Sequence, residues 1–269
     1  MDIATLVGIT VGLAGLLAGF LIEGGHIGQL ISISGFLIVI IGTFGATMAS
    51  FSFRELAALP AALKTLVAHK IPDEPTVVQQ IVHYAETARR EGLLSLEKKL
   101  EEVDDPFLRK GLQLIVDGAD PEVVKSVLQT EIFAIQERHR IAHDIFESAG
   151  GFSPTMGIIG TVMGLIHVLA NISTPDKLGP AIAMAFTATL YGVSAANVIY
   201  FPIGFRLKNI TRKEINIRLL MMEGLLALQA GHNPIIIMEQ LTAFLSPVQQ
   251  ARQKAAQEEG TRGEGLATP

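Results

Sequence analysis

Cysteine and tryptophan are both absent from the 269 residues, and several long stretches carry no charged side chain at all. Without cysteine, the chain has no disulfide, no thiolate metal site and no cysteine nucleophile. The net charge of −5 offers no basic excess for a phosphate backbone, so nucleic acid is not an expected partner. We find no catalytic Ser/His/Asp order, no cluster of metal ligands and no glycine-rich phosphate loop. The sequence therefore predicts a protein that is not an enzyme and that uses no cofactor and no resident metal.

Charge is missing above all from two neighbouring runs, Ser148–Pro175 and Leu178–Phe205, which are joined by one short polar turn. A helix needs about 20 apolar residues to cross the hydrocarbon core of a bilayer, and both runs are longer than that. They predict a helical hairpin in a membrane. Two similar runs, Ile3–Ile22 and residues 30–53, predict two earlier spans. The mean hydropathy of +0.42 agrees with an all-α membrane protein of four transmembrane helices.

Polar segments of helical period separate and follow these runs. Asp105, Asp120 and Asn233 each precede a proline, which is the pattern of a helix cap followed by a first-turn proline. The helix that starts after Asp120 is expected to continue into the third span. We divide the chain into transmembrane helices 1 and 2 (1–53), a helical cytoplasmic domain (54–147), transmembrane helices 3 and 4 (148–205), cytoplasmic C-terminal helices (206–247) and a disordered tail (248–269).

The basic residues predict the orientation of the chain in the membrane. Of the 21 Lys and Arg, only Lys177 lies in the turn between the third and fourth spans, and all others follow the second or the fourth span. The positive-inside rule then places both termini and the segment 54–147 in the cytoplasm. Only two short turns are left for the other side.

Small residues recur at steps of three and four along each helix of the predicted hairpin, and one threonine lies among them on each, Thr161 and Thr189. Such faces pack against another helix and not against lipid. The two hydroxyls also offer oxygen atoms to a passing ion or water. Thr187 and Ser194 add further hydroxyls, but their helical phase differs from that of Thr189. His167, the one histidine in the spans, is interpreted as a packing or interfacial residue near the outer end.

No span contains Asp, Glu, Lys or Arg, although intramembrane carboxylates are the usual mark of ion coupling. If the hairpin conducts ions, the essential carboxylate therefore has to come from a partner helix.

Three strings of residues together carry a family resemblance. The third span opens with Gly151-Phe152-Ser153-Pro154, the fourth contains Ala188-Thr189-Leu190-Tyr191-Gly192, and the middle segment contains the run from Arg89 to Glu97. With its four spans, the chain resembles the MotA/TolQ/ExbB family, and within it the MotA-type stator subunits of the bacterial flagellar motor. The resemblance covers about residues 1–247.

The resemblance implies a function and a set of partners. MotA-type subunits form a pentamer in the bacterial inner membrane around a dimer of MotB-type single-span subunits, each of which brings an ion-binding aspartate. Ion flow into the cytoplasm turns the ring, and the cytoplasmic domains push on the rotor protein FliG. A hairpin that has hydroxyls and no carboxylate fits such a partner.

By the same resemblance, Arg89 and Glu97 engage the rotor, and Thr189 faces the pore. Pro154 and Pro202 match two conformational prolines near the cytoplasmic ends of the third and fourth spans. Thr161 resembles the threonine of sodium-driven relatives, where proton-driven ones often have a small apolar residue. Because a sodium ion must replace lost water with hard oxygens, we expect sodium, bound transiently near the two threonines, in preference to a proton.

Other interpretations remain open from the sequence. A proton-driven energiser of outer-membrane processes, of the ExbB or TolQ type, generally has three spans and lacks the stretch from Arg89 to Glu97. A plain membrane scaffold needs neither that stretch nor the threonine faces. At single positions, a solvated charged face explains Arg89 and Glu97, a helix start explains Pro154 and a kink explains Pro202.

Overall fold

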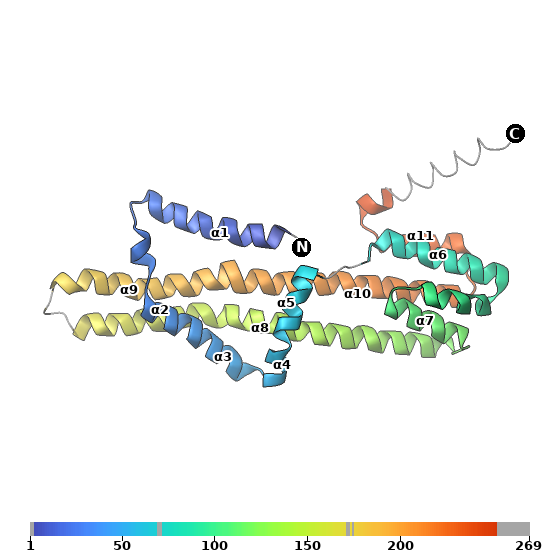
Figure 1. The fold of residues 1–269 in the computed structure, drawn as a ribbon, viewed down its shortest axis with the longest axis horizontal. Helices are drawn as coiled ribbons and strands as arrows, with labels where there is room; N and C mark the ends of the chain where they lie inside the picture. The colour runs from blue at the N-terminus through green and yellow to red at the C-terminus, as the bar shows by residue number, and fades with distance from the viewer. Residues whose placement is uncertain (1–2, 69–71, 171–172, 174, 252–269) are drawn as a thin grey trace. The chain divides into compact units, whose positions relative to one another are not determined.

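The computed structural model describes residues 3–68, 72–170, 173 and 175–251, and this part of the chain is helical with no strand (Figure 1). The helices are α1 (Ile3–Ile22), η1 (Ile27–Leu30), α2 (Ile33–Phe36), η2 (Leu37–Ile41), α3 (Gly42–Ser50), α4 (Phe53–Ala57), α5 (Leu59–Ala68), α6 (Glu74–Glu91), η3 (Leu93–Glu102), α7 (Pro106–Val116), α8 (Pro121–Ala170), α9 (Pro175–Ser194), η4 (Ala195–Tyr200), α10 (Phe201–Gln229) and α11 (Pro234–Thr242). Elements η1 and η3 are 3₁₀ helices, and η2 and η4 are π-helical segments inside the second and fourth spans.

Four helical stretches of the described chain are long and apolar enough to cross a membrane, as the sequence predicts. The first ends at Ile22 as expected, whereas the second runs only from Ile33 to Ser50. Serine caps explain the shorter second span. The hydroxyl of Ser32 accepts a hydrogen bond from the backbone of the next helix, and Ser52 forms a capping box with Glu55 that starts α4. The hydroxyl and the backbone N–H of Ser52 lower the pKa of Glu55.

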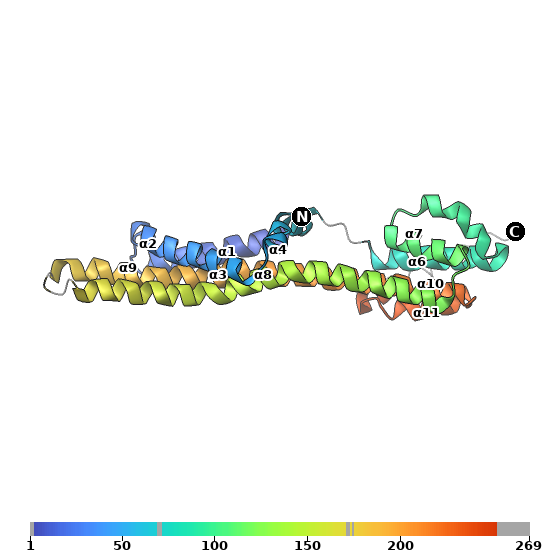
Figure 2. The ribbon, with the colours of Figure 1, turned by 90° about the horizontal axis from the view of Figure 1, so that it is seen from below.

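The chain forms two compact units, of which unit 1 comprises Met1–His69 and Glu137–Thr211. Its centre is a hairpin in which α9 runs alongside the second half of α8, as both views show (Figure 1, Figure 2). The third span is therefore the continuation of a helix that starts at Pro121, as the sequence predicts. Pro154 lies inside this helix, so the alternative of a helix start at that proline is wrong.

Unit 2 comprises Lys70–Gln136 and Arg212–Pro269 and packs around one hydrophobic core. The core joins α6, η3 and α7 to parts of α8, α10 and α11. Its largest fully buried side chains include Ile81, Leu96, Phe107, Leu108, Leu112, Leu128, Ile217, Leu220, Met221, Leu225, Ile237 and Leu241. Segments that lie before the third span and after the fourth thus share a core, although the sequence division treated them as separate parts.

Two of the three predicted caps are present in unit 2. Asp105 accepts hydrogen bonds from the backbone N–H groups of Phe107 and Leu108 at 2.9 and 3.1 Å, and α7 begins at the proline that follows it. Asn233 caps α11 in the same way through the N–H of Ile235. Gly118 adopts a φ of +77° after α7, a backbone conformation that favours glycine.

A nearly buried ion pair links the start of α7 to α10. One guanidinium nitrogen of Arg218, Nη1, lies 2.6 Å from each carboxylate oxygen of Asp105. The guanidinium also lies 5.3 Å from the centre of the Phe107 ring. The carboxylate of Asp105 therefore serves both as the cap of one helix and as the partner of a cation on another.

The C-terminal end departs from the sequence division. Residues 248–251, which the sequence places in a disordered tail, continue a helical turn that starts at Pro247. Gln249 and Gln250 tie this turn to unit 2 by hydrogen bonds to Glu74 and to the carbonyl oxygens of Thr242 and Leu245. Residues 252–269 lie outside the described part of the chain.

Candidate functional site

The two threonines that the sequence places on facing helices do meet in unit 1. Thr161 comes from α8 and Thr189 from α9, and their hydroxyl groups are hydrogen-bonded to each other. Oγ1 of Thr161 lies 3.0 Å from the carbonyl oxygen of Ala185 and 3.2 Å from that of Gly157. Oγ1 of Thr189 lies 3.3 Å from the same Gly157 oxygen. Two hydroxyl and two carbonyl oxygens thus converge in the seam between the helices, where both threonines are partly buried.

This oxygen cluster has the chemistry of a site for a hard cation. Neutral carbonyl and hydroxyl oxygens replace the hydration shell of an alkali ion in selective pores. The cluster itself carries no formal charge, and none of the four predicted charge-free runs contains a carboxylate. Negative charge to balance a bound cation would therefore have to come from another chain.

Glycine allows the two helices to approach this closely. A Cβ atom added at Gly157 would stand 3.0 Å from the Cα of Thr189, and one added at Gly164 would stand 2.6 Å from the Cβ of Ala185. A Cβ atom at Gly192 would stand 3.1 Å from the Cα of Gly157. The prediction that the small-residue faces of the third and fourth spans pack against a helix is confirmed, and the helix that each face meets is the other one of the hairpin.

Pro154 lies in α8 beside a second contact of the same seam. The buried hydroxyl of Ser153 donates a hydrogen bond of 2.9 Å to the carbonyl oxygen of Gly192 on α9. Because proline has no N–H, the carbonyl of Gly150 lacks its usual helical donor four residues later. The helix is thus weakened internally where a hydrogen bond joins it to its neighbour.

Pro202 follows directly on the π-helical segment η4. The N–H of Phe201 bonds to the carbonyl of Ala196, five residues back, as a π-helix requires. The missing N–H of Pro202 removes the α-helical partner of the Val198 carbonyl. Pro202 also lines a cavity of about 470 Å³ between α1 and the fourth span, together with Gly12 and others.

Two further polar residues of the spans stand apart from the oxygen cluster. The hydroxyl of Thr187 donates to the carbonyl oxygen of Ala183 in its own helix at 2.8 Å. His167 is exposed in the last turn of α8.

Arg89 and Glu97 lie in unit 2, and both side chains are exposed. Arg89 is in the last turn of α6 and Glu97 is in η3, and the chain turns between them at Gly92, whose φ is +88°. Among the described residues, neither side chain forms a hydrogen bond or an ion pair. Their charges are therefore available to another molecule.

The contacts of Tyr191 were not predicted from the sequence. Its hydroxyl donates to the carbonyl oxygen of Leu30 and accepts a hydrogen bond of 3.0 Å from the N–H of Ser32. The fourth span is thereby fastened to the start of the second. A tyrosine in a charge-free run was the available signal, because a buried phenol needs a polar partner.

These features define a class: a polytopic helical membrane protein with an uncharged oxygen cluster between its third and fourth spans. The model of the MotA/TolQ/ExbB proton channel family matches residues 99–219. Motility protein A of Borreliella burgdorferi is 34% identical over 247 residues, which cover 92% of this chain and 95% of that protein. The chain therefore belongs to the MotA/TolQ/ExbB proton channel family.

Two solved structures share the fold over nearly the whole chain. The structure of C. jejuni MotAB has a TM-score of 0.87 and 28% sequence identity, and the flagellar MotAB stator complex from Bacillus subtilis has a TM-score of 0.86 and 33% identity. Each match covers 92% of this chain and 97% of the other.

Proposed function

We propose that this chain is a stator subunit of the bacterial flagellar motor, which couples the influx of a cation to rotation. The observation that carries the proposal is the match to MotAB structures at a TM-score of up to 0.87 over 92% of the chain. Motility protein A relatives of similar length support it. The chain lies in the inner membrane with both termini and unit 2 in the cytoplasm, as the distribution of basic residues predicts.

The subunit acts in a complex, because its own spans lack a carboxylate. A pentamer of this chain surrounds a dimer of a MotB-type single-span partner, whose aspartates supply the missing negative charge. Each aspartate and the oxygens around Thr161 and Thr189 hold the ion in turn as the ring rotates. Four converging neutral oxygens favour sodium over a proton, since a proton needs only a carboxylate and water.

Torque passes to the rotor protein FliG through the exposed charges of Arg89 and Glu97. Pro154 and Pro202 give the spans the conformational freedom for this step. Each proline removes one helical hydrogen bond, and these losses lie next to the Ser153–Gly192 contact and the η4 segment.

The test is the swimming of cells that carry this chain and its natural MotB-type partner as their only stator. Sodium is removed at constant proton-motive force and then restored. Swimming that stops and returns with sodium supports the proposal. Cells that fail to swim in either medium, with both proteins present in the membrane, contradict the stator function.

A threonine variant sharpens the choice of ion. In a sodium motor, Thr161→Ala removes one oxygen ligand and raises the sodium concentration for half-maximal speed by about tenfold, or about 1.4 kcal/mol. Thr155→Ala is the matched control, since that exposed hydroxyl, within the part of the chain that the structure describes, bonds only to the carbonyl of Phe152 in its own helix. If cells with the unaltered chain swim equally well with and without sodium, the ion is a proton.

A further inference from the structure

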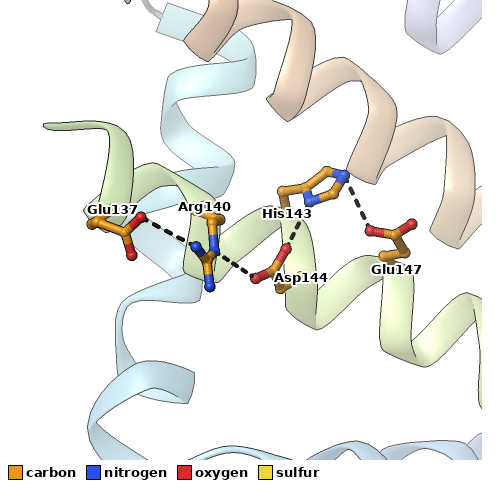
Figure 3. Close-up of polar contacts among 5 residues, drawn as sticks. All are labelled: Glu137, Arg140, His143, Asp144 and Glu147. Carbon is orange, nitrogen blue, oxygen red and sulfur yellow. Dashed lines mark hydrogen bonds and ion pairs between the residues drawn. The ribbon is translucent and has the colours of Figure 1, made fainter. Parts of the chain in front are cut away.

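Five polar side chains gather on one stretch of α8 immediately before the third span (Figure 3). They are Glu137, Arg140, His143, Asp144 and Glu147. The last of them is the final charged residue before the charge-free run that begins at Ser148. The group contains three carboxylates and one guanidinium, so its charge is −2 when the imidazole is neutral.

The imidazole of His143 is held from one side by a chain of ion pairs. Its Nδ1 lies 2.9 Å from Oδ1 of Asp144, whose other oxygen lies 3.2 Å from Nε of Arg140. The guanidinium of Arg140 is held in turn by Glu137 at 3.2 Å. With the Nδ1 proton donated to Asp144, the lone pair of the ring lies on Nε2.

The other ring nitrogen faces Glu147. His143 is only 7% exposed, and its Nε2 is buried and has no hydrogen-bond partner. This atom lies 3.4 Å from Oε2 of Glu147, whereas a charge-assisted N–H···O bond is about 2.7–2.9 Å long. The Nε2 lone pair and the Glu147 carboxylate repel each other at this distance, so a cation between them would stabilise both groups.

The spacing fits a tetrahedral metal ion. Zinc binds imidazole nitrogen and carboxylate oxygen at about 2.1 Å, and two such ligands at the tetrahedral angle are about 3.4 Å apart. The separation of Nε2 from Oε2 is 3.4 Å. Ligands four residues apart on one helix, with a carboxylate on the remote nitrogen of the histidine, are the arrangement found in zinc sites.

We propose that His143 and Glu147 bind a divalent transition-metal ion of the zinc type, with Asp144 orienting the imidazole. One ring nitrogen of His143 and one carboxylate oxygen from each of Asp144 and Glu147 lie within 4.8 Å of one another. The side chain of Glu147 is 52% exposed, so its carboxylate can be reached from solvent. Imidazole with carboxylate selects zinc and its neighbours over magnesium or calcium, which take oxygen ligands.

The site would brace α8 where it enters the membrane. The carbonyl oxygen of His143 faces α10, where a Cβ atom added at Gly204 would stand 3.7 Å from it. A bound ion would fix the buried ring and, through it, the turn of α8 that packs against this glycine. No metal site was predicted from the sequence, although His143 and Glu147 stand at the four-residue spacing that places two side chains on one face of a helix.

The experiment is titration of Zn²⁺ into the full chain, purified in detergent without a polyhistidine tag and followed by calorimetry. Co²⁺ serves as a spectroscopic probe, since four-coordinate Co²⁺ absorbs strongly in the visible range. We expect one ion per chain. His143→Ala and Glu147→Gln should abolish binding or weaken it at least tenfold, and Asp144→Asn should weaken it about 10- to 100-fold.

His139→Ala is the matched control, because this histidine lies one turn earlier on the same helix. It should leave Zn²⁺ affinity unchanged. Circular dichroism and size-exclusion profiles must match the parent for each variant that is scored. The proposal is overturned if the parent chain does not bind Zn²⁺ at neutral pH, if binding survives in His143→Ala, or if His139→Ala abolishes it equally.

Discussion

At the scale of single residues, Asp105 makes two stabilising contacts. It caps α7 through two backbone N–H groups and pairs with Arg218, and the two charged side chains are 16% and 14% exposed. Removing one partner of a nearly buried pair leaves the other charge desolvated and unpaired. Such a position matters more to stability than the exposed pair of Lys99 and Glu102.

We therefore predict that Asp105→Ala destabilises unit 2 by about 3 kcal/mol. Hydrogen exchange at the backbone amides of α7 in the full chain measures the change, because both contacts of Asp105 hold that helix. The adjacent Asp104 is exposed, so Asp104→Ala should change stability by less than about 0.5 kcal/mol. Equal effects of the two substitutions would show that neither the cap nor the pair with Arg218 contributes to stability.

Glu97 gives a second prediction at this scale. It is exposed in η3 and makes no ion pair among the described residues, so Glu97→Lys should leave folding and membrane assembly intact. If its charge engages the rotor, stall torque should fall severalfold, as tethered-cell measurements would report. Glu101→Lys, which reverses the charge of another exposed residue in the same helix, is the control. A loss of membrane assembly in Glu97→Lys would speak against the assigned role.

At the scale of elements, the hairpin of α8 and α9 depends on backbone proximity. Gly192 stands against the backbone of Gly157 on α8. A methyl group at either position would meet backbone atoms of the other helix, which cannot move aside as a side chain can. The hydrogen bonds around Thr161 and Thr189 require the same close spacing.

Gly192→Ala should force the two helices apart at a cost of about 2 kcal/mol. That cost lowers the melting temperature in detergent by about 4–8 °C. Swimming should be lost as well, because the oxygen cluster separates. Gly151→Ala tests the specificity of the effect, since a Cβ atom there meets nothing within 4 Å. If both variants have the same melting temperature as the parent chain, the two helices tolerate a wider spacing than we infer.

The sequence predicted these elements unevenly, for physical reasons. Spans and helix caps depend on residues that are close together in the sequence. The four spans and the starts of α7, α8 and α11 could therefore be predicted. The meeting of Thr161 with Thr189 followed from helical phase. The pair of Asp105 and Arg218 was not legible, because 113 residues separate its members. The same holds for the π-helical segments, since tertiary packing and not local propensity selects them.

At the scale of the whole molecule, one chain leaves most of its first span uncovered. None of the Thr5–Ile22 window is buried, and Gly8, Gly15 and Gly19 have nothing within 4 Å of an added Cβ atom. Small residues in such a span accept close contacts from a neighbouring helix as readily as from lipid. An assembly of several copies would use this surface.

The chain purified alone should therefore form a ring-sized oligomer. For a pentamer of 28.8 kDa subunits, native mass spectrometry should give five times that mass, about 144 kDa. The measurement needs a detergent that preserves the helical content of the membrane fraction. A stable monomer under those conditions would remove the basis for the pentamer.

The π-helical segment η4 has a consequence for how the fourth span moves. An α-helix advances about 100° per residue, and a π segment stores one residue beyond the regular count. The residues of α10 are therefore out of phase with the helix before Ala195. Such a segment can shift along a helix because only a few backbone hydrogen bonds are exchanged at each step. If η4 shifted by one residue, only the residues that it passes would rotate about the helix axis, and these residues lie between Thr189 and Pro202.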